Sequence, residues 1–120
     1  MADVWPLSGS LNIGTRPVRE GAYLVTVAGE VDMLTAGSLR RTMAPLAADP
    51  TVRVLVCDLS RVSFFGCAGV TALLDTREAM LEHGASLRLV AQAYVVLRPL
   101  ALTGLLEVLP VSADVRSALS

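Results

Sequence analysis

The sequence predicts an α/β fold with a mostly parallel β-sheet, in the element order ββαβαβαβα. Short runs rich in valine and leucine alternate along the chain with longer segments in which apolar residues recur at helical spacing. Residues 52–57 are apolar at nearly every position, which is typical of a strand buried on both faces of a parallel sheet. Strands that alternate with helices require right-handed crossover connections, and these connections place the strands parallel.

The predicted elements fill residues 10–120, which we expect to form a single domain after a flexible tail of residues 1–9. The tail mixes proline, glycine and serine without any period. The predicted strands are residues 11–18, 23–29, 52–57, 87–91 and 106–111. The predicted helices are residues 35–48, 67–83, 93–102 and 114–119, the last with Ser112 as its N-cap.

Local signals predict where several of these elements end. Gly21 supplies the turn between the first two strands. Pro45 has no N–H to donate to the carbonyl four residues earlier, so we expect the first helix to kink or end there, and Pro99 to break the third helix. His83 and Gly84 favour the end of the second helix, because a positive charge suits a helix C-terminus and glycine suits a left-handed cap.

The composition excludes several classes of protein. The chain of 120 residues is 53% hydrophobic, which excludes intrinsic disorder. Ten basic residues against 11 acidic ones leave no excess positive charge for direct nucleic-acid binding. The longest clean apolar run, residues 64–74, is shorter than the roughly 20 residues of a membrane-spanning helix, and the N-terminus lacks a signal-peptide pattern. We expect a cytoplasmic protein without membrane insertion, and basic residues that are all arginine indicate a GC-rich bacterial genome.

The sequence contains little that could carry catalysis. The single histidine, His83, is predicted at an exposed helix end without a nucleophilic partner. Cys57 and Cys67 are too few for a disulfide framework and lack the spacing of a zinc site. Neither of the two common glycine-rich phosphate-binding motifs is present. We therefore expect no enzyme, no cofactor and no bound metal.

The most informative segment is residues 58–69, which joins the central strand to the longest helix. Small residues at positions 66–69 allow a sharp turn and leave the helix N-terminus uncovered. Sites in parallel sheets form at the carboxyl ends of the strands, where this segment must lie, and free N–H groups there suit an anion or an acidic group of a partner. The alternative is a tight turn whose glycines serve only packing. The residues alone favour neither interpretation.

Two motifs in this sequence resemble a known family. The first is Gly29-Glu-Val-Asp32 followed by Thr35-Ala36, and the second is Asp58-Leu-Ser-x-Val-x-Phe64 followed by Gly69. Together, at this separation, they resemble the STAS domain of bacterial anti-sigma factor antagonists. The resemblance covers residues 11–119. It implies a small mixed sheet, mostly parallel, with helices on one face.

The resemblance also implies a function in protein binding. Such an antagonist binds an anti-sigma factor of the serine-kinase type and so releases a sigma factor for transcription, while phosphorylation of a serine in the first turn of the helix dissociates the complex. The partner-binding residues that the resemblance implies are Asp32, Thr35, Ser63, Phe65, Gly66, Cys67, Ala68 and Gly69. For Asp32, the alternative is a cap of the first helix. A homodimer is left open.

The sequence departs from the family at the phosphoacceptor. The family usually has Asp-Ser-Ser-Gly where this chain has Gly66-Cys-Ala-Gly69, so Cys67 takes the place of the phosphorylated serine. Cys67 either makes the antagonist insensitive to a serine kinase or provides a thiol whose oxidation adds negative charge there. Two further functions stay open: a STAS scaffold subunit of a stress-sensing assembly or of a lipid-transport ATPase complex, and a sensor of a nucleotide or another small ligand.

Overall fold

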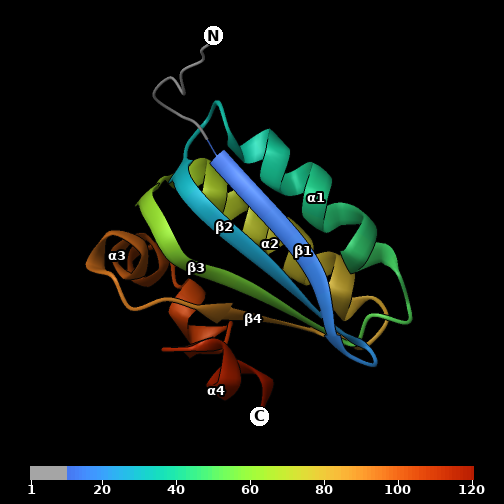
Figure 1. Ribbon diagram of the computed structural model, residues 1–120. Coiled ribbons are helices and arrows are strands. Elements are labelled where there is room, and N and C mark those ends of the chain that lie inside the picture. Colours follow the sequence, from blue (N-terminus) through green and yellow to red (C-terminus); the bar gives the residue numbers. More distant parts are fainter. Residues whose placement is uncertain (1–10) are drawn as a thin grey trace, which may run out of the picture.

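A computed structural model describes residues 11–120 of the protein (Figure 1), so the predicted tail of residues 1–9 lies outside the described part. Within residues 11–120, five strands form one sheet in the order β1-β2-β3-β4-β5. The first pair is antiparallel and the other pairs are parallel, which confirms the predicted mostly parallel sheet. The strands are β1 (Leu11–Arg19), β2 (Ala22–Val31), β3 (Val54–Phe65), β4 (Ser86–Val90) and β5 (Val111–Ser112).

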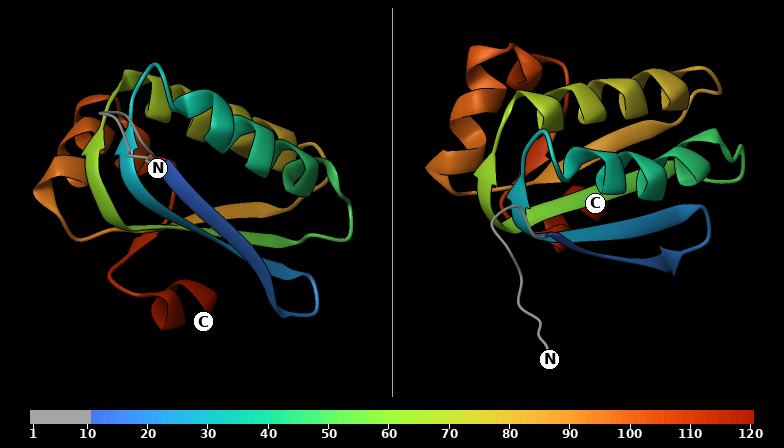
Figure 2. Two further views of the ribbon diagram at one scale, coloured as in Figure 1. Left: turned by 45° about the horizontal axis from the view of Figure 1, so that its top comes forward. Right: turned by 90° about the horizontal axis from the view of Figure 1, so that it is seen from above.

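The helices cover both faces of the sheet unequally. They are α1 (Ala36–Ala48), α2 (Cys67–Leu81), α3 (Tyr94–Leu102) and α4 (Val115–Leu119), with a short 3₁₀ helix, η1 (Leu105–Glu107), between α3 and β5. Figure 2 shows α1 and α2 side by side over one face, with α3 beyond α2. The predicted fold class is thus confirmed. The C-terminal α4 is an addition to it, because this helix packs on the opposite face.

The central strand β3 is buried from both sides at its start, as residues 52–57 predict. Leu55 and Cys57 belong to the large core between the sheet and α1, α2 and α3. Val56 points the other way, into the smaller core under α4. Burial in the large core raises the pKa of the Cys57 thiol to about 12, because desolvation penalises the thiolate.

The second half of β3 was not predicted. After Cys57 the sequence predicts a turn, yet the strand continues to Phe65. Two irregularities in the pairing of β3 with β2 explain the difference, because each places one extra residue on β3. Along this half, the buried residues recur at every third position, at Leu59, Val62 and Phe65. That spacing hides the alternation by which strands are normally found.

Pro45 was expected to kink or end its helix and Pro99 to break its helix, and both lie inside helices that continue past them. The helix α1 passes through Pro45 and ends at Ala48, and α3 passes through Pro99 and ends at Leu102. Each proline leaves one carbonyl of the helix without its N–H partner. These carbonyls belong to Arg41 and Val95, two exposed residues, so water can satisfy them.

The C-terminal segment differs most from the prediction. Residues 106–111 were expected to form a strand, but η1 occupies the start of this segment and β5 has only two residues. The helix α4 is capped by Asp114, whose carboxylate accepts a hydrogen bond from the N–H of Ser117 (2.8 Å). Ser112, the expected cap, pairs with Val90 in the sheet instead.

Candidate functional site

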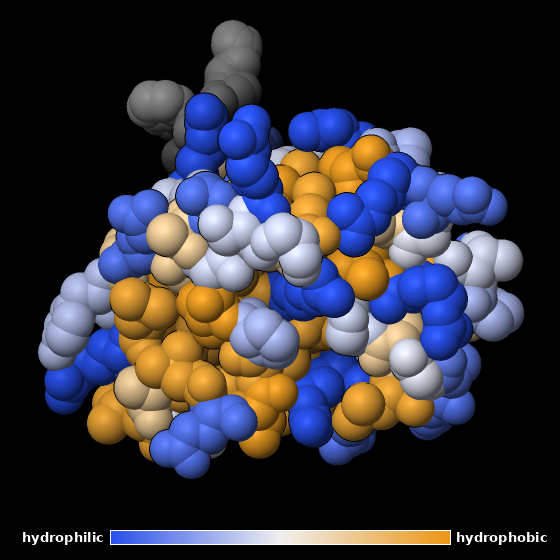
Figure 3. All heavy atoms as spheres, turned by 90° about the horizontal axis from the view of Figure 1, so that it is seen from below, coloured by the Kyte–Doolittle hydropathy of each residue, from blue (hydrophilic) through white to orange (hydrophobic). Residues whose placement is uncertain are grey.

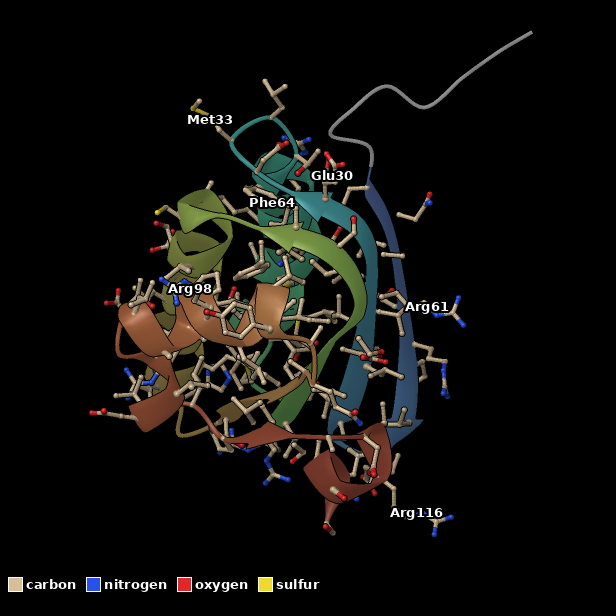
Figure 4. All side chains as sticks on the ribbon, turned by 90° about the vertical axis from the view of Figure 1, so that its left-hand side faces the viewer. Glu30, Met33, Arg61, Phe64, Arg98 and Arg116 are labelled. Atoms are coloured by element: carbon tan, nitrogen blue, oxygen red, sulfur yellow. The ribbon has the colours of Figure 1, made fainter. Side chains whose placement is uncertain are left out.

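Two segments far apart in the sequence meet at the carboxyl ends of β2 and β3. In the sheet, Val31 pairs with Phe65, and the N–H of Gly66 donates to the carbonyl of Val31 (2.9 Å). These contacts hold the loop after β2 next to the first turn of α2. Figure 4 shows Met33 and Phe64, one from each segment, at the same end of the molecule. The two motifs of the sequence therefore form one surface.

The loop after β2 is organised by its own hydrogen bonds. The carboxylate of Asp32 accepts hydrogen bonds from the N–H groups of Leu34 (2.9 Å) and Thr35 (3.1 Å). The hydroxyl of Thr35 donates to the carbonyl of Glu30 (2.7 Å) and accepts from the N–H of Asp32 (2.9 Å). These bonds form a turn before the first helix, and the N-cap of α1 is Thr35, without a side-chain cap hydrogen bond, so the alternative interpretation of Asp32 as the cap of this helix is not confirmed.

The loop turns two large apolar side chains into solvent. Met33 is 85% exposed and Leu34 is 84% exposed, while Thr35, a predicted contact residue, is buried. Large apolar side chains that stand exposed at the tip of a loop are typical of a surface that binds another molecule.

Of the two phenylalanines at the end of β3, one is buried and the other reaches the surface. Phe65 was predicted as a contact residue, but it is 2% exposed and packs in the core. Phe64 is 48% exposed instead. Ser63, another predicted contact residue, is exposed, and its hydroxyl donates to the carbonyl of Gly29 (3.3 Å). Strict alternation from Leu55 and Cys57, which face the same core as Phe65, already points Phe64 outward, and the two irregularities together leave this order unchanged.

The glycines at the start of α2 have different roles. Gly66 is the N-cap and is half-buried, whereas Gly69 is buried. A Cβ at Gly69 would lie 2.7 Å from Cε1 of Phe65 and 2.8 Å from Cγ1 of Val31. Gly69 is therefore a packing residue, as the second interpretation of this turn proposed, and it was wrong to expect it at the partner-binding surface.

The residues between these glycines remain accessible. Cys67 is exposed and Ala68 is half-buried in the first turn of α2. A hollow of about 650 Å³ lies between this turn and the loop after β2, and it is lined by Asp32, Met33, Ala36, Gly37, Arg40, Phe64, Gly66, Cys67 and Ala68. The guanidinium of Arg40 at this hollow forms an ion pair with Asp75 of α2, which ties the two helices together. We name Met33, Leu34, Phe64, Cys67 and Ala68 the carboxyl-end surface.

The carboxyl-end surface differs from the predicted site in its members. Of the predicted residues, Asp32, Ser63, Gly66, Cys67 and Ala68 are at least partly accessible. The prediction missed the large side chains Met33, Leu34 and Phe64. Two of these could have been found from the sequence, because Asp-Met-Leu-Thr places two large apolar residues inside a polar loop signal.

The remaining chemistry of the described residues lies away from this surface. His83 follows α2 at the end opposite to Cys67 and is half-buried rather than exposed, and its Nε2 is buried without a hydrogen-bond partner in residues 11–120. Gly84 there adopts the predicted left-handed cap, with φ of 74°. In the same residues, no cluster of His, Cys, Asp and Glu has the makeup of a metal site, and no helix is long and apolar enough to cross a membrane.

The fold and the two motifs define a domain class. The sequence model of the STAS domain family matches residues 15–118, and this protein therefore belongs to the STAS domain family. Among its relatives is the anti-sigma-F factor antagonist RsfB of Mycobacterium tuberculosis, which is 36% identical over 86 residues, 71% of this chain and 68% of RsfB. The antagonist RsfA of the same organism is 30% identical over 116 residues, 96% of this chain and 90% of RsfA.

The similarity extends to a solved structure. The crystal structure of an anti-sigma factor antagonist from Mycobacterium paratuberculosis superposes with a TM-score of 0.85 at 31% identity. The match covers 96% of each chain. The shared fold therefore extends over nearly the whole of both chains.

Proposed function

We propose that this protein is an anti-sigma factor antagonist, which binds an anti-sigma factor through the carboxyl-end surface and thereby releases a sigma factor. The observation that carries the proposal is the exposed apolar surface itself, since Met33, Leu34 and Phe64 stand in solvent on a backbone that hydrogen bonds hold in place. A preformed apolar surface loses little conformational entropy on binding. The names of the relatives at 30–36% identity support the choice of partner.

With Cys67 at the position of the phosphorylated serine, binding of the anti-sigma factor is controlled differently from binding by an antagonist that a kinase phosphorylates there. It is the first residue of α2 and exposed, next to Phe64 in the lining of the same hollow. Phosphate on a hydroxyl at this place would add about −1.5 to −2 charge beside apolar contacts and so oppose binding. A thiol offers no such acceptor to a serine kinase. We propose that binding here is independent of phosphorylation at position 67.

Calorimetric titration with the cognate anti-sigma factor tests the proposal. We expect a specific complex, and we expect Phe64→Ala to weaken it about tenfold or more, because truncation of a central aromatic residue is among the costliest changes in an interface. Val108→Ala is the matched control: Val108 is 46% exposed, against 48% for Phe64, but lies beside Leu81 and Ala85, near the other end of α2. Addition of the protein to the complex of sigma and anti-sigma factor should free the sigma factor. A wild-type protein that does not bind the anti-sigma factor refutes the proposal.

A further inference from the structure

The outer side of α3 has an unusual composition for a surface helix. Val96 and Leu100 face the core, and the opposite side exposes Tyr94, Arg98 and Leu102 at intervals of four residues. Tyr94 is 69% exposed and Leu102 is 72% exposed. Arg98 is the only charged residue in this helix. Surface helices normally carry several charged residues on their solvent side, so this stripe has the character of a contact surface.

Tyr94 and Arg98 form a defined pair on this stripe. The guanidinium carbon of Arg98 lies 5.7 Å from the centre of the Tyr94 ring, and its Nη1 donates to the phenol oxygen (2.6 Å). An exposed pair of this kind contributes little to the free energy of unfolding. It does hold both long side chains in one conformation, which lowers the entropy cost of contacting a partner. Tyrosine and arginine are also enriched in the centres of interfaces.

The position of α3 places this pair on the side of the molecule that carries the carboxyl-end surface. Val90 at the end of β4 pairs with Asp58, so β3 continues beyond β4 as far as Phe65. The helix α3 contacts β3 and also α2. In Figure 4, Met33 and Phe64 lie near the upper end of the molecule and Arg98 lies lower, on α3. The view from below, opposite the upper end that carries Met33 in Figure 4, shows a further gathering of apolar side chains (Figure 3).

The charges on this side indicate the chemistry of the partner. Arg98 donates to a neutral phenol, and no carboxylate within residues 11–120 forms an ion pair with it. The carboxylates of the neighbouring site are already engaged, Asp32 with its own loop and Asp75 with Arg40. A partner with an acidic side chain would supply the missing charge, and a charge-assisted hydrogen bond to a guanidinium is stronger than the present bond to a phenol.

We propose that Tyr94 and Arg98 form a second contact area for the anti-sigma factor, which receives an acidic side chain on Arg98 beside an apolar group on Tyr94. This inference rests on the proposed function, because it assumes the same partner. It adds a charged contact to a surface that otherwise binds through apolar side chains. Binding should therefore weaken as salt rises, in proportion to the part that Arg98 contributes.

Titration of the anti-sigma factor with variants of α3 tests the inference. We expect Tyr94→Ala and Arg98→Glu each to raise the Kd about tenfold or more, and we expect Arg98→Ala to flatten its salt dependence. Arg116→Glu is the matched control, since Arg116 is exposed on α4 at the other end of the molecule and should leave the Kd unchanged (Figure 4). Circular dichroism checks that each variant is folded.

The outcomes separate this inference from the proposed function. If the wild type binds and Phe64→Ala weakens binding, but Tyr94→Ala and Arg98→Glu bind like the wild type, the second contact area is refuted and the antagonist function stands. If the wild type does not bind the anti-sigma factor, the proposed function and the second contact area are both refuted. Sedimentation of the protein alone tests whether a second copy of the chain, rather than the anti-sigma factor, binds to α3. A dimer that Arg98→Glu dissociates would show that it does, and this result would also refute the inference.

Discussion

Gly69 packs against the ring of Phe65 so closely that a Cβ at position 69 would lie 2.7 Å from Cε1 of the ring. This contact fixes the first turn of α2 against the end of β3. Phe65 and Val31, the two neighbours of that Cβ, are buried in the core and cannot move aside without a cavity forming elsewhere. The carboxyl-end surface therefore depends on a glycine that is itself inaccessible.

We expect Gly69→Ala to lower the free energy of unfolding by about 1–3 kcal/mol, the usual cost of overpacking a core. Urea denaturation measures the change. Gly37→Ala is the matched control, because its Cβ meets only the flexible end of Arg41, at 3.2 Å, and alanine favours a helix by about 1 kcal/mol over glycine. Equal stability of Gly69→Ala and the wild type would contradict the packing role.

Leu55 is fully buried in the centre of β3, and its truncation should destabilise the whole domain. We expect Leu55→Ala to lower the free energy of unfolding by about 2–5 kcal/mol, through lost burial and the cavity left behind. Leu106→Ala, at an apolar position that is 38% exposed, should change it by about 0.5 kcal/mol or less. A loss at Leu55 as small as that at Leu106 would place residues 52–57 outside the core.

Asp114 makes the docking of α4 dependent on pH. Hydrogen bonds from Ser117 lower the pKa of its carboxyl below the usual 3.8. Because the folded pKa lies below the unfolded one, the stabilisation is complete above the unfolded pKa and is lost as the pH falls through the folded pKa. We expect the difference in stability between the wild type and Asp114→Ala to shrink below about pH 4, as measured by urea midpoints from pH 6 to 3. A difference that stays constant over this range would exclude the carboxylate as the cap.

The two cysteines should react at very different rates. Burial raises the pKa of Cys57 to about 12, so its thiolate is absent at neutral pH, whereas Cys67 is exposed. We expect iodoacetamide to modify one thiol per native molecule and two in denaturant, and Cys67→Ser to abolish the fast reaction. Mild peroxide then separates the two hypotheses about Cys67. Unchanged affinity for the anti-sigma factor after oxidation of the thiol would support an antagonist that is merely insensitive to the kinase. Weakened affinity would establish redox control.

Restoring a hydroxyl at position 67 should restore control by a kinase. If the cognate anti-sigma factor is a serine kinase, the wild type should take up no phosphate at this position, whereas Cys67→Ser should be phosphorylated and should then lose affinity. Mass spectrometry after incubation with ATP measures both. Ser63 and Thr71 are exposed hydroxyls near the same turn and serve as internal references. Phosphate on the wild type at either residue would show that control has moved rather than disappeared.

The sequence by itself determined the order of the elements and the type of sheet. Residues 52–57 and the helical spacing in 35–48 and 67–83 are local patterns, and a local pattern is enough when one face of an element must meet a core. The two motifs were also sufficient to indicate the family and the end of the sheet at which its surface forms.

Only the tertiary structure decided which side chains make that surface. Phe65 rather than Phe64 is buried because Val31 of β2 pairs with it in the sheet and α2 packs on its ring, and contacts between separate elements are not displayed by a stretch of single sequence. Gly69 is a packing residue because Phe65 and Val31 converge on it from two other elements. The cap of α4 was decided in the same way, since the sheet pairs Ser112 with Val90 and leaves the helix start to Asp114.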